Sequence, residues 1–408
     1  RGILFHMRRQ LPDGQLLFLV NTSIESPSAG EFVSTLKGIE QWEAYTGKTQ
    51  PYPFSATASG VSAGFKLPPS GSLLLFLSDK PGKPAPSVSE VATVLQPDGA
   101  PIIRRVEPNV LTLDYVDITA GGETKTNVYF YGASQFAFQK NGLPRNPWDS
   151  AVQFKDELIT KNFAPDSGFT ASYKFTIASR VPKNLSIVIE RPDLYTITCN
   201  GKSVKAKPGD WWLDKAFGKI PLAAVAHPGD NIVTINASPF TIYHELEPAY
   251  LLGDFTLKPG ELGFVITADK PLELGKWKEQ GHPFYSAGVA YRQRFDLKKP
   301  DGKYVVALPQ WLGSVAKVSV NGKLAGYIDA PPWECDVTQR IKRGENSVEV
   351  VVIGTLKNTL GPHHGKPALG AAWPSAFHIG PNPGPPPGDG YSTVGYGLFE
   401  PFVLRQVR

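Results

Sequence analysis

The chain has few cysteines and no long run of like charges or of apolar residues. Its two cysteines, Cys199 and Cys335, are too few for a disulfide framework or a zinc site, and they leave the redox compartment open. The net charge of +5 is small for 408 residues, and no lysine or arginine run is long enough for a nucleic-acid-binding stripe. Apolar runs such as 73–77 are far shorter than the roughly 20 residues of a membrane-spanning helix. We therefore expect neither nucleic-acid binding nor a membrane span.

Helical periodicity is also nearly absent. A (β/α)8 barrel needs eight alternating strands and helices over about 250 residues, and these cannot be placed in this sequence. The chain instead has short alternating strands separated by turns rich in its 40 glycines and 38 prolines. Hydrophobic residues make up 41% of the chain, enough to bury substantial cores. The pattern predicts an all-β protein built from β-sandwiches.

An order of motifs in the middle of the chain returns near its end. Each series has an aromatic strand, an Asn-Gly hairpin signal, a glycine turn before a further strand, and a final apolar strand. The first series comprises 173–177, Asn200-Gly201, 228–233 and 251–257, and the second comprises 291–295, Asn321-Gly322, 343–348 and 397–404. Two copies of one β-rich unit predict two similar β-sandwich domains in tandem.

The predicted division of the chain has four parts. Residues 1–79 form a small antiparallel β domain, and 80–165 form a linker and a transitional β segment. β-Sandwiches follow at 166–270 and 271–408. The second sandwich contains a Pro/Gly-rich insertion at 361–389, which cannot lie in a sheet interior and is expected to be a surface loop.

Glu245 and Glu247 offer a pair of carboxylates. On a strand, residues two apart face the same way and lie about 6.5–7 Å apart along the chain. That spacing is close to the lower end of the roughly 6.5–9.5 Å that separates the carboxyl groups of inverting glycosidases. Ion pairing at a strand edge or domain seam is the plainer interpretation, because a hydrolase also needs an acid of raised pKa in a cleft.

Several tryptophans are candidates for stacking against sugar rings. The apolar face of a pyranose packs on a flat aromatic ring, and packing in a core or a domain seam is the alternative for each tryptophan. In the adjacent pair Trp211-Trp212, one ring should face the core and the other should be partly exposed. The carbohydrate-binding candidates are Trp212, Trp311, Trp333 and Trp373.

Metal sites have weaker support. His363 and His364, with His378, lie in the 361–389 insertion and offer a metal pair, although an exposed polar loop is the simpler interpretation. The loop could instead line the substrate cleft of a neighbouring catalytic domain. A structural calcium remains open, but the acidic candidates are scattered along the chain: Asp166, Asp214, Asp230 and Asp336. No cofactor is certain.

The order of four runs resembles a known family. The runs are 148–155 (WDSAVQFK), 167–173 (SGFTASY), 250–255 (YLLGDF) and 281–288 (GHPFYSAG). Together they resemble the C-terminal portion of the α-L-rhamnosidases of glycoside hydrolase family 106. The two repeats resemble galactose-binding-like jelly-roll domains, the sugar-binding type of glycoside hydrolase family 2. Residues 1–79 resemble the small β domain that follows the catalytic barrel.

The resemblance implies a C-terminal accessory region, carbohydrate-binding or structural, of a bacterial enzyme that is secreted or periplasmic and acts on plant-type polysaccharides. The implied partners are a rhamnose-containing glycan and a catalytic barrel upstream of Arg1. No position matches the barrel's carboxylates or its calcium ligands, so this chain alone is expected to be non-catalytic. The alternatives are a stand-alone carbohydrate-binding protein, a purely structural module, and an intact hydrolase with a site between β domains.

Overall fold

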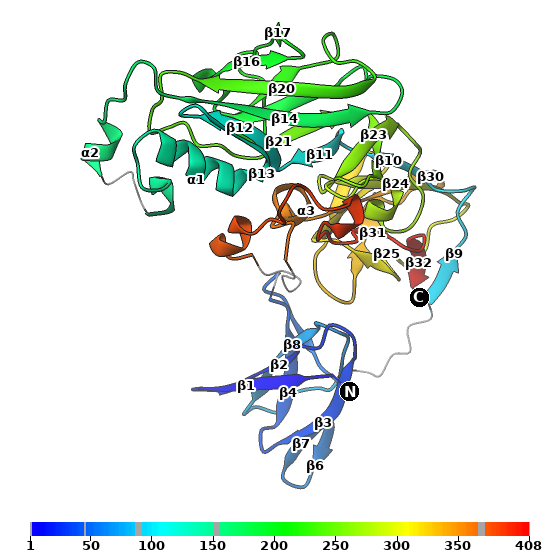
Figure 1. Cartoon of the computed structure of the whole chain (residues 1–408). Coiled ribbons are helices and arrows are strands. Elements are labelled where there is room, and N and C mark those ends of the chain that lie inside the picture. The colour runs from blue at the N-terminus through cyan, green and yellow to red at the C-terminus, as the bar shows by residue number, and fades with distance from the viewer. Residues whose placement is uncertain (1, 45, 86–91, 151–154, 366–371, 408) are drawn as a thin grey trace.

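The computed structural model describes the whole chain except residues 1, 45, 86–91, 151–154, 366–371 and 408. The protein is mostly β, and its strands pair almost throughout in antiparallel fashion, which confirms the predicted fold class (Figure 1). Helices are few and short: α1 (Phe130–Lys140), α2 (Asp156–Ile159) and α3 (Lys357–Leu360).

The N-terminal part is a small sandwich of two sheets. One sheet has the order β1 (Leu4–Leu11), β2 (Gly14–Asn21), β8 (Ser72–Ser78), β4 (Gly38–Trp42) and β5 (Thr49–Pro51). The other has the order β3 (Ser28–Ser34), β7 (Gly60–Leu67) and β6 (Ser55–Thr57). Alternate residues of β7 point into a separate core, which the chain builds from Leu, Ile, Val and Phe of both sheets. Figure 1 shows this sandwich, in blue, apart from the other two.

The first large sandwich also has two sheets. One has the order β11 (Asn109–Leu113), β21 (Ala249–Gly253), β15 (Ser186–Glu190), β19 (Asp214–Pro221) and β18 (Trp211–Trp212). The other has the order β13 (Glu123–Tyr129), β12 (Tyr115–Ala120), β14 (Phe169–Ile177), β20 (Gly229–Ala237), β16 (Thr196–Cys199) and β17 (Lys202–Ser203). The hairpin of β22 (Phe255–Pro259) and β23 (Phe264–Ala268) joins the second sheet at β14.

The second large sandwich repeats this strand order. One sheet has the order β9 (Ala92–Leu95), β32 (Val403–Val407), β25 (Lys303–Ala307) and β29 (Glu334–Asp336). The facing sheet has the order β10 (Ile102–Arg105), β24 (Val289–Leu297), β30 (Gly344–Ile353), β27 (Val315–Val320) and β28 (Lys323–Ile328). A ribbon of β26 (Trp311–Leu312) and β31 (Gly397–Leu398) lies beside them.

The pairing of β9 and β10 shows that the two sandwiches are nested. Strand β9 pairs with the C-terminal β32, and β10 pairs with β24, although both β9 and β10 precede the first sandwich in the chain. They correspond to β11 and β12, which pair in the same way within the first sandwich. The first sandwich is thus inserted between β10 and β24. The range 80–165, predicted as a linker and transitional segment, supplies opening strands to both sandwiches.

Two asparagines make the repeat visible at atomic detail. Asn231 accepts a hydrogen bond from the His227 amide at 3.0 Å, and its side-chain amide donates to the carbonyl of His227 at 2.8 Å. Asn346 does the same with the amide and carbonyl of Lys342, at 2.9 and 2.7 Å. In each copy the Asn of the Asn-Gly hairpin, with φ near +50°, donates to this asparagine. The shared motifs of the sequence therefore encode the same turn twice.

A single hydrophobic core runs through both large sandwiches. At their seam, the Asn109 side chain donates to the carbonyls of Phe255 and Gly281, and the Thr112 hydroxyl donates to the Thr359 carbonyl. The 361–389 insertion does not behave wholly as an exposed loop, because His363 and His364 are both buried. The described part of this segment, orange to red in Figure 1, lies beneath α1 and β13. It packs on the first sandwich, where the His378 ring stacks on Tyr131 at 3.9 Å.

Candidate functional site

A hollow of about 980 Å³ lies at the open edge of the first large sandwich. It forms because β17 has only two residues, after which the chain leaves the sheet. Gly209, with φ +80°, turns the chain back so that Trp211 pairs with Gly218 of β19. A side chain at Gly218 would collide with the backbone-fixed ring of Pro192, since a Cβ there would lie 2.5 Å from its Cγ. Both glycines are therefore required by the shape of the hollow.

Trp211 lies on the wall of this hollow, with 48% of its surface exposed. Its neighbour Trp212 turns inward and lies 5.3 Å from the Tyr250 ring. The pair thus has one inner and one outer ring, as the sequence predicted. Sequence reasoning placed Trp212 among the binding candidates, whereas the exposed ring is that of Trp211. The register of β18 on β19 distinguishes them, and this register is not visible in the sequence.

The acidic groups of the hollow are already engaged. Arg191 donates to both carboxylate oxygens of Asp193, at 2.9 and 2.7 Å, and lowers the pKa of that carboxyl group. Asp210 forms an ion pair with Lys219 at 3.0 Å. Nearby, burial and the charge of Asp214 raise the pKa of Glu190, but Glu190 does not line the hollow. The hollow thus presents hydrogen-bonding groups and an aromatic ring, and its two acids form salt bridges within the protein.

The other tryptophan candidates do not join Trp211. Trp311 and Trp333 meet edge-to-face at 5.3 Å in the second sandwich, where both are partly buried against the core. Trp373 is 74% exposed and precedes the 3-10 turn Pro374–His378 of the insertion. The four predicted binding residues therefore lie at three separate places, with only Trp311 and Trp333 in contact, and their role in carbohydrate binding stays a prediction.

Glu245 and Glu247 do not have the expected strand geometry. They lie in an irregular segment, and β21 begins only at Ala249. The Glu245 carboxylate accepts a hydrogen bond from the Asn146 side chain at 2.9 Å, and the Glu245 carbonyl accepts one from the Tyr195 hydroxyl. The strand-based spacing that suggested a glycosidase pair is thus wrong for this segment, because hydrogen bonds from Asn146 and Tyr195, rather than pairing with a neighbouring strand, hold Glu245.

His363 and His364 are held by protein groups. His364 Nε2 lies 2.7 Å from a carboxylate oxygen of Asp114, whose other oxygen accepts a hydrogen bond from the Tyr391 hydroxyl at 3.0 Å. His363 Nε2 lies 2.8 Å from the Asn358 carbonyl, and burial lowers its pKa to about 4. Across the described ranges, no group of three or more His, Cys, Asp or Glu side chains is arranged to hold a metal ion. We therefore assign no metal to these histidines.

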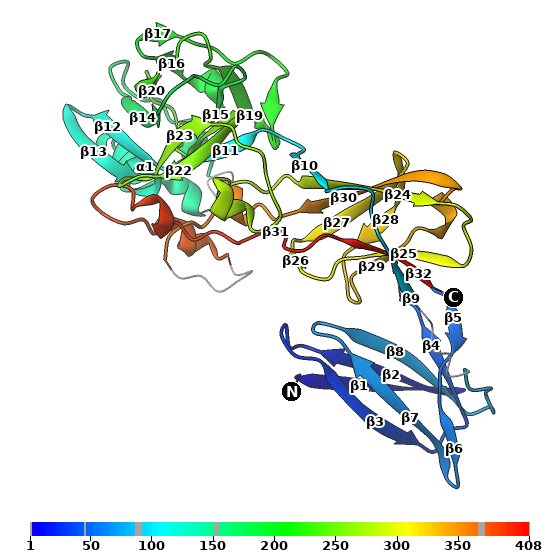
Figure 2. The ribbon, with the colours of Figure 1, turned by 90° about the vertical axis from the view of Figure 1, so that its right-hand side faces the viewer.

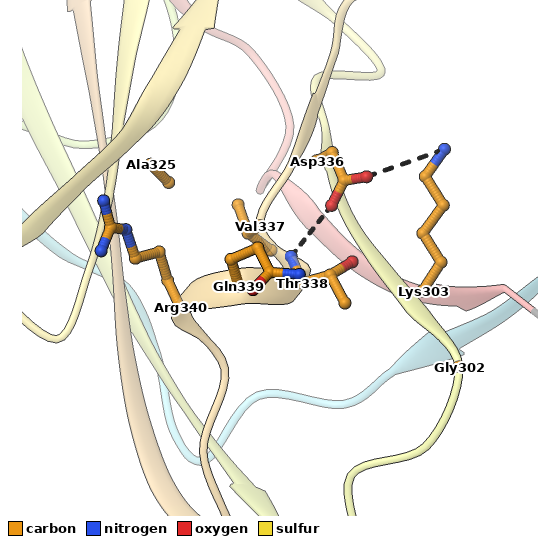
Figure 3. Close-up of a pocket in the computed structure, with 8 residues that line it drawn as sticks. All are labelled: Gly302, Lys303, Ala325, Asp336, Val337, Thr338, Gln339 and Arg340. Carbon is orange, nitrogen blue, oxygen red and sulfur yellow. Dashed lines mark hydrogen bonds and ion pairs between the residues drawn. The ribbon is translucent and has the colours of Figure 1, made fainter.

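Two other hollows are polar and lack an aromatic platform. One, of about 590 Å³ on the second sandwich, is shown in Figure 3, where the Asp336 carboxylate accepts a hydrogen bond from the Thr338 amide and lies 4.0 Å from Lys303. The other lies at the seam, where Arg105 bridges His282 and Asp269, each at 3.0 Å. No tryptophan, tyrosine or phenylalanine is among the described residues that line either hollow, which leaves the hollow beside Trp211 as the leading candidate.

Known proteins are similar to parts of this chain. No family model matches it. Over 280 residues it is 35% identical to a protein of Formosa agariphila named "Putative beta-glucuronidase", a match that covers 60% of this chain and 22% of that protein. The chain therefore spans about a fifth of the length of this curated relative.

Solved structures show likeness at low identity. A rhamnosidase from Novosphingobium sp. PP1Y has 15% identity and a TM-score of 0.41, covering 99% of this chain and 24% of that one. An α-L-rhamnosidase of Streptomyces avermitilis, complexed with L-rhamnose, has 12% identity and a TM-score of 0.27, covering 86% and 36%. Likenesses at this level do not extend to function. The sequence match relates part of this chain to part of a protein named as a β-glucuronidase. In the part of the chain that the structure describes, no helix is long and apolar enough to cross a membrane.

Proposed function

We propose that this chain is a carbohydrate-contacting C-terminal accessory region of an α-L-rhamnosidase-type glycoside hydrolase acting on plant-type polysaccharides. The proposal includes a bacterial enzyme that is secreted or periplasmic. The observation that carries it is the exposed Trp211 ring on the wall of the 980 Å³ hollow. The motif order supports the choice of a rhamnosidase-type parent, and the sequence match to a protein named as a β-glucuronidase supports a glycoside hydrolase parent in general.

The chemistry of the hollow suits a sugar. A pyranose ring presents an apolar C–H face, which packs on an indole, and a rim of hydroxyl groups, which need donors and acceptors nearby. Backbone and side-chain groups of Thr196, Ser203 and Lys205 line the same hollow as Trp211. Because Asp193 and Asp210 are held in salt bridges, neither is free to act as a general acid. These features support binding rather than catalysis.

Strand β1 of this chain offers a surface on which the proposed partner, a catalytic barrel, could dock. Strand β1 pairs with β2 along its whole length, yet nearly all of its residues are exposed on both faces. Leu4, Phe5 and Met7 are each more than two-fifths exposed. Apolar side chains on both faces of one strand are typical of an interaction surface.

Titration of tryptophan fluorescence with glycans tests the proposal. We expect quenching by rhamnose-containing oligosaccharides, and an affinity lowered about tenfold or more in Trp211→Ala, because buried aromatic contacts contribute most of such binding. Tyr327→Ala, which removes an equally exposed ring from the second sandwich, is the matched control. Full affinity in Trp211→Ala would refute a binding role for this hollow.

The parent activity needs its own assay. Hydrolysis of an aryl α-L-rhamnoside and an aryl β-D-glucuronide is measured with this chain and with any longer natural form. We expect no turnover by this chain and rhamnoside cleavage by the longer form. Cleavage of the glucuronide alone would favour a β-glucuronidase-type parent, in line with the name of the sequence relative. Turnover by this chain would refute the accessory role.

A further inference from the structure

The hollow beside Trp211 has an excess of uncompensated positive charge. Lys205, Lys207 and Lys215 all line it and are exposed. Among the described residues none of the three forms an ion pair, whereas Arg191 and Lys219 neutralise the two acids, Asp193 and Asp210. Three lysines therefore line the same hollow as one exposed indole, and no carboxylate of the described residues forms an ion pair with them.

We infer that this hollow selects acidic glycans, whose carboxylate or sulfate groups bind Lys205, Lys207 and Lys215 while a sugar ring stacks on Trp211. The inference rests on the proposed function and specifies its substrate class. Lysine is a compact point charge with three donors, suited to a single acidic group on each sugar. Such exposed pairs act mainly on selectivity and on the rate of encounter, and they weaken as salt is added.

The second sandwich shows that this feature is not a by-product of the fold. There the equivalent hairpin strand, β28, has six residues and pairs with β27 along its length. In the first sandwich β17 has two, and the segment 204–210 that replaces the rest carries Lys205 and Lys207. The hollow and its lysines thus arise together where the two copies diverge.

A nucleic acid is the less favoured acidic ligand. Base stacking on a groove needs a series of aromatic rings and a basic track several nucleotides long. The hollow has one exposed tryptophan and three lysines without an ion pair among the described residues, in a volume of about 980 Å³. That scale matches one or a few sugar units.

Isothermal titration calorimetry at low ionic strength tests the inference by comparing the affinity for an acidic glycan with the affinity for its neutral form. One pair is a rhamnogalacturonan and its carboxyl-reduced form, and another is a sulfated galactan and its desulfated form, so that carboxylate and sulfate are distinguished. The variant is Lys205→Gln/Lys207→Gln/Lys215→Gln. The control is Lys298→Gln/Lys299→Gln/Lys323→Gln, which removes the same three charges from exposed positions of the second sandwich.

We expect an acidic form to bind at least about tenfold tighter than its neutral form, since each exposed ion pair contributes up to about fivefold in affinity. The hollow variant should lose this preference, and the control variant should keep it. Equal binding of acidic and neutral forms by the wild type would overturn the inference while leaving the proposed function intact. Equal loss in the control variant, or tighter binding of an oligothymidylate, would also overturn it. Binding of none of the glycans would overturn both proposals.

Discussion

The buried Asp114 carboxylate forms hydrogen bonds across the seam of the two large sandwiches. It follows β11 in the first sandwich, and its partners, His364 and Tyr391, belong to the segment between β30 and β32 of the second. All three side chains are buried. A hydrogen bond to a charged group contributes about 1.5–3 kcal/mol, and removal of one partner leaves the others unsatisfied. We therefore expect Asp114→Ala to lower the free energy of unfolding of the joint core by about 3–5 kcal/mol.

Urea unfolding, followed by circular dichroism at pH 7, measures this change. Asp114→Asn keeps the shape and one acceptor, so its loss should fall between those of the wild type and Asp114→Ala. Asp329→Ala, which removes an exposed carboxylate from the second sandwich, should change the free energy of unfolding by less than about 0.5 kcal/mol. Limited proteolysis within 361–389 should accelerate only in the Asp114 variants. A loss in Asp114→Ala as small as that in Asp329→Ala would refute the idea that this network clamps the insertion.

Two further predictions concern buried groups of the same core. Burial lowers the pKa of His363 to about 4, and burial with the Arg105 charge lowers that of His282 to about 4. The unfolded chain then binds protons that the folded chain does not, so stability is complete above about pH 6.5 and falls towards pH 4, by about 3 kcal/mol per histidine. Unfolding of His363→Gln at pH 7 and pH 4.5 should show a smaller fall than the wild type, and an unchanged fall would contradict this assignment. Separately, Asn231→Ala and Asn346→Ala should each lower the free energy of unfolding by about 3 kcal/mol, because each removes a buried side chain that makes several hydrogen bonds to the backbone of its turn. Unequal losses in thermal unfolding would show that the two turns are not energetically equivalent.

The parts of the fold that the sequence predicted are those with local signatures. Alternation in runs such as 169–177 gives a buried face directly, and the structure buries every second residue of β14. The Asn-Gly pairs at 200 and 321 predicted hairpins, since both residues of such turns take positive φ. These signals lie within a few residues of one another, so one sequence is enough to read them.

The parts that the sequence did not predict depend on contacts between distant segments. Pairing of β9 with β32 joins residues about 300 apart, and a four-residue strand carries no mark of its partner. His364 is buried, and Asp114, which lies 250 residues away in the sequence, accepts its hydrogen bond. The composition of this loop predicted an exposed segment, but a buried polar ring needs a hydrogen-bond partner, and the partner of His364 is a carboxylate far away in the sequence.

Because the first sandwich is inserted into the second, one end of it is attached to the second sandwich and the opposite edge faces away from it. Both chain connections of this domain, after β10 and before β24, run to the second sandwich, and Asn109 fastens the seam between them. Figures 1 and 2 both show the β16–β17 hairpin on the side of the first sandwich away from the second. The hollow beside Trp211 begins at this hairpin. A domain anchored through both ends has little freedom to rotate, so a ligand at its outer edge would be held in a constant orientation relative to the rest of the protein. For the accessory role that we propose, this arrangement favours presentation of a bound glycan in a fixed orientation.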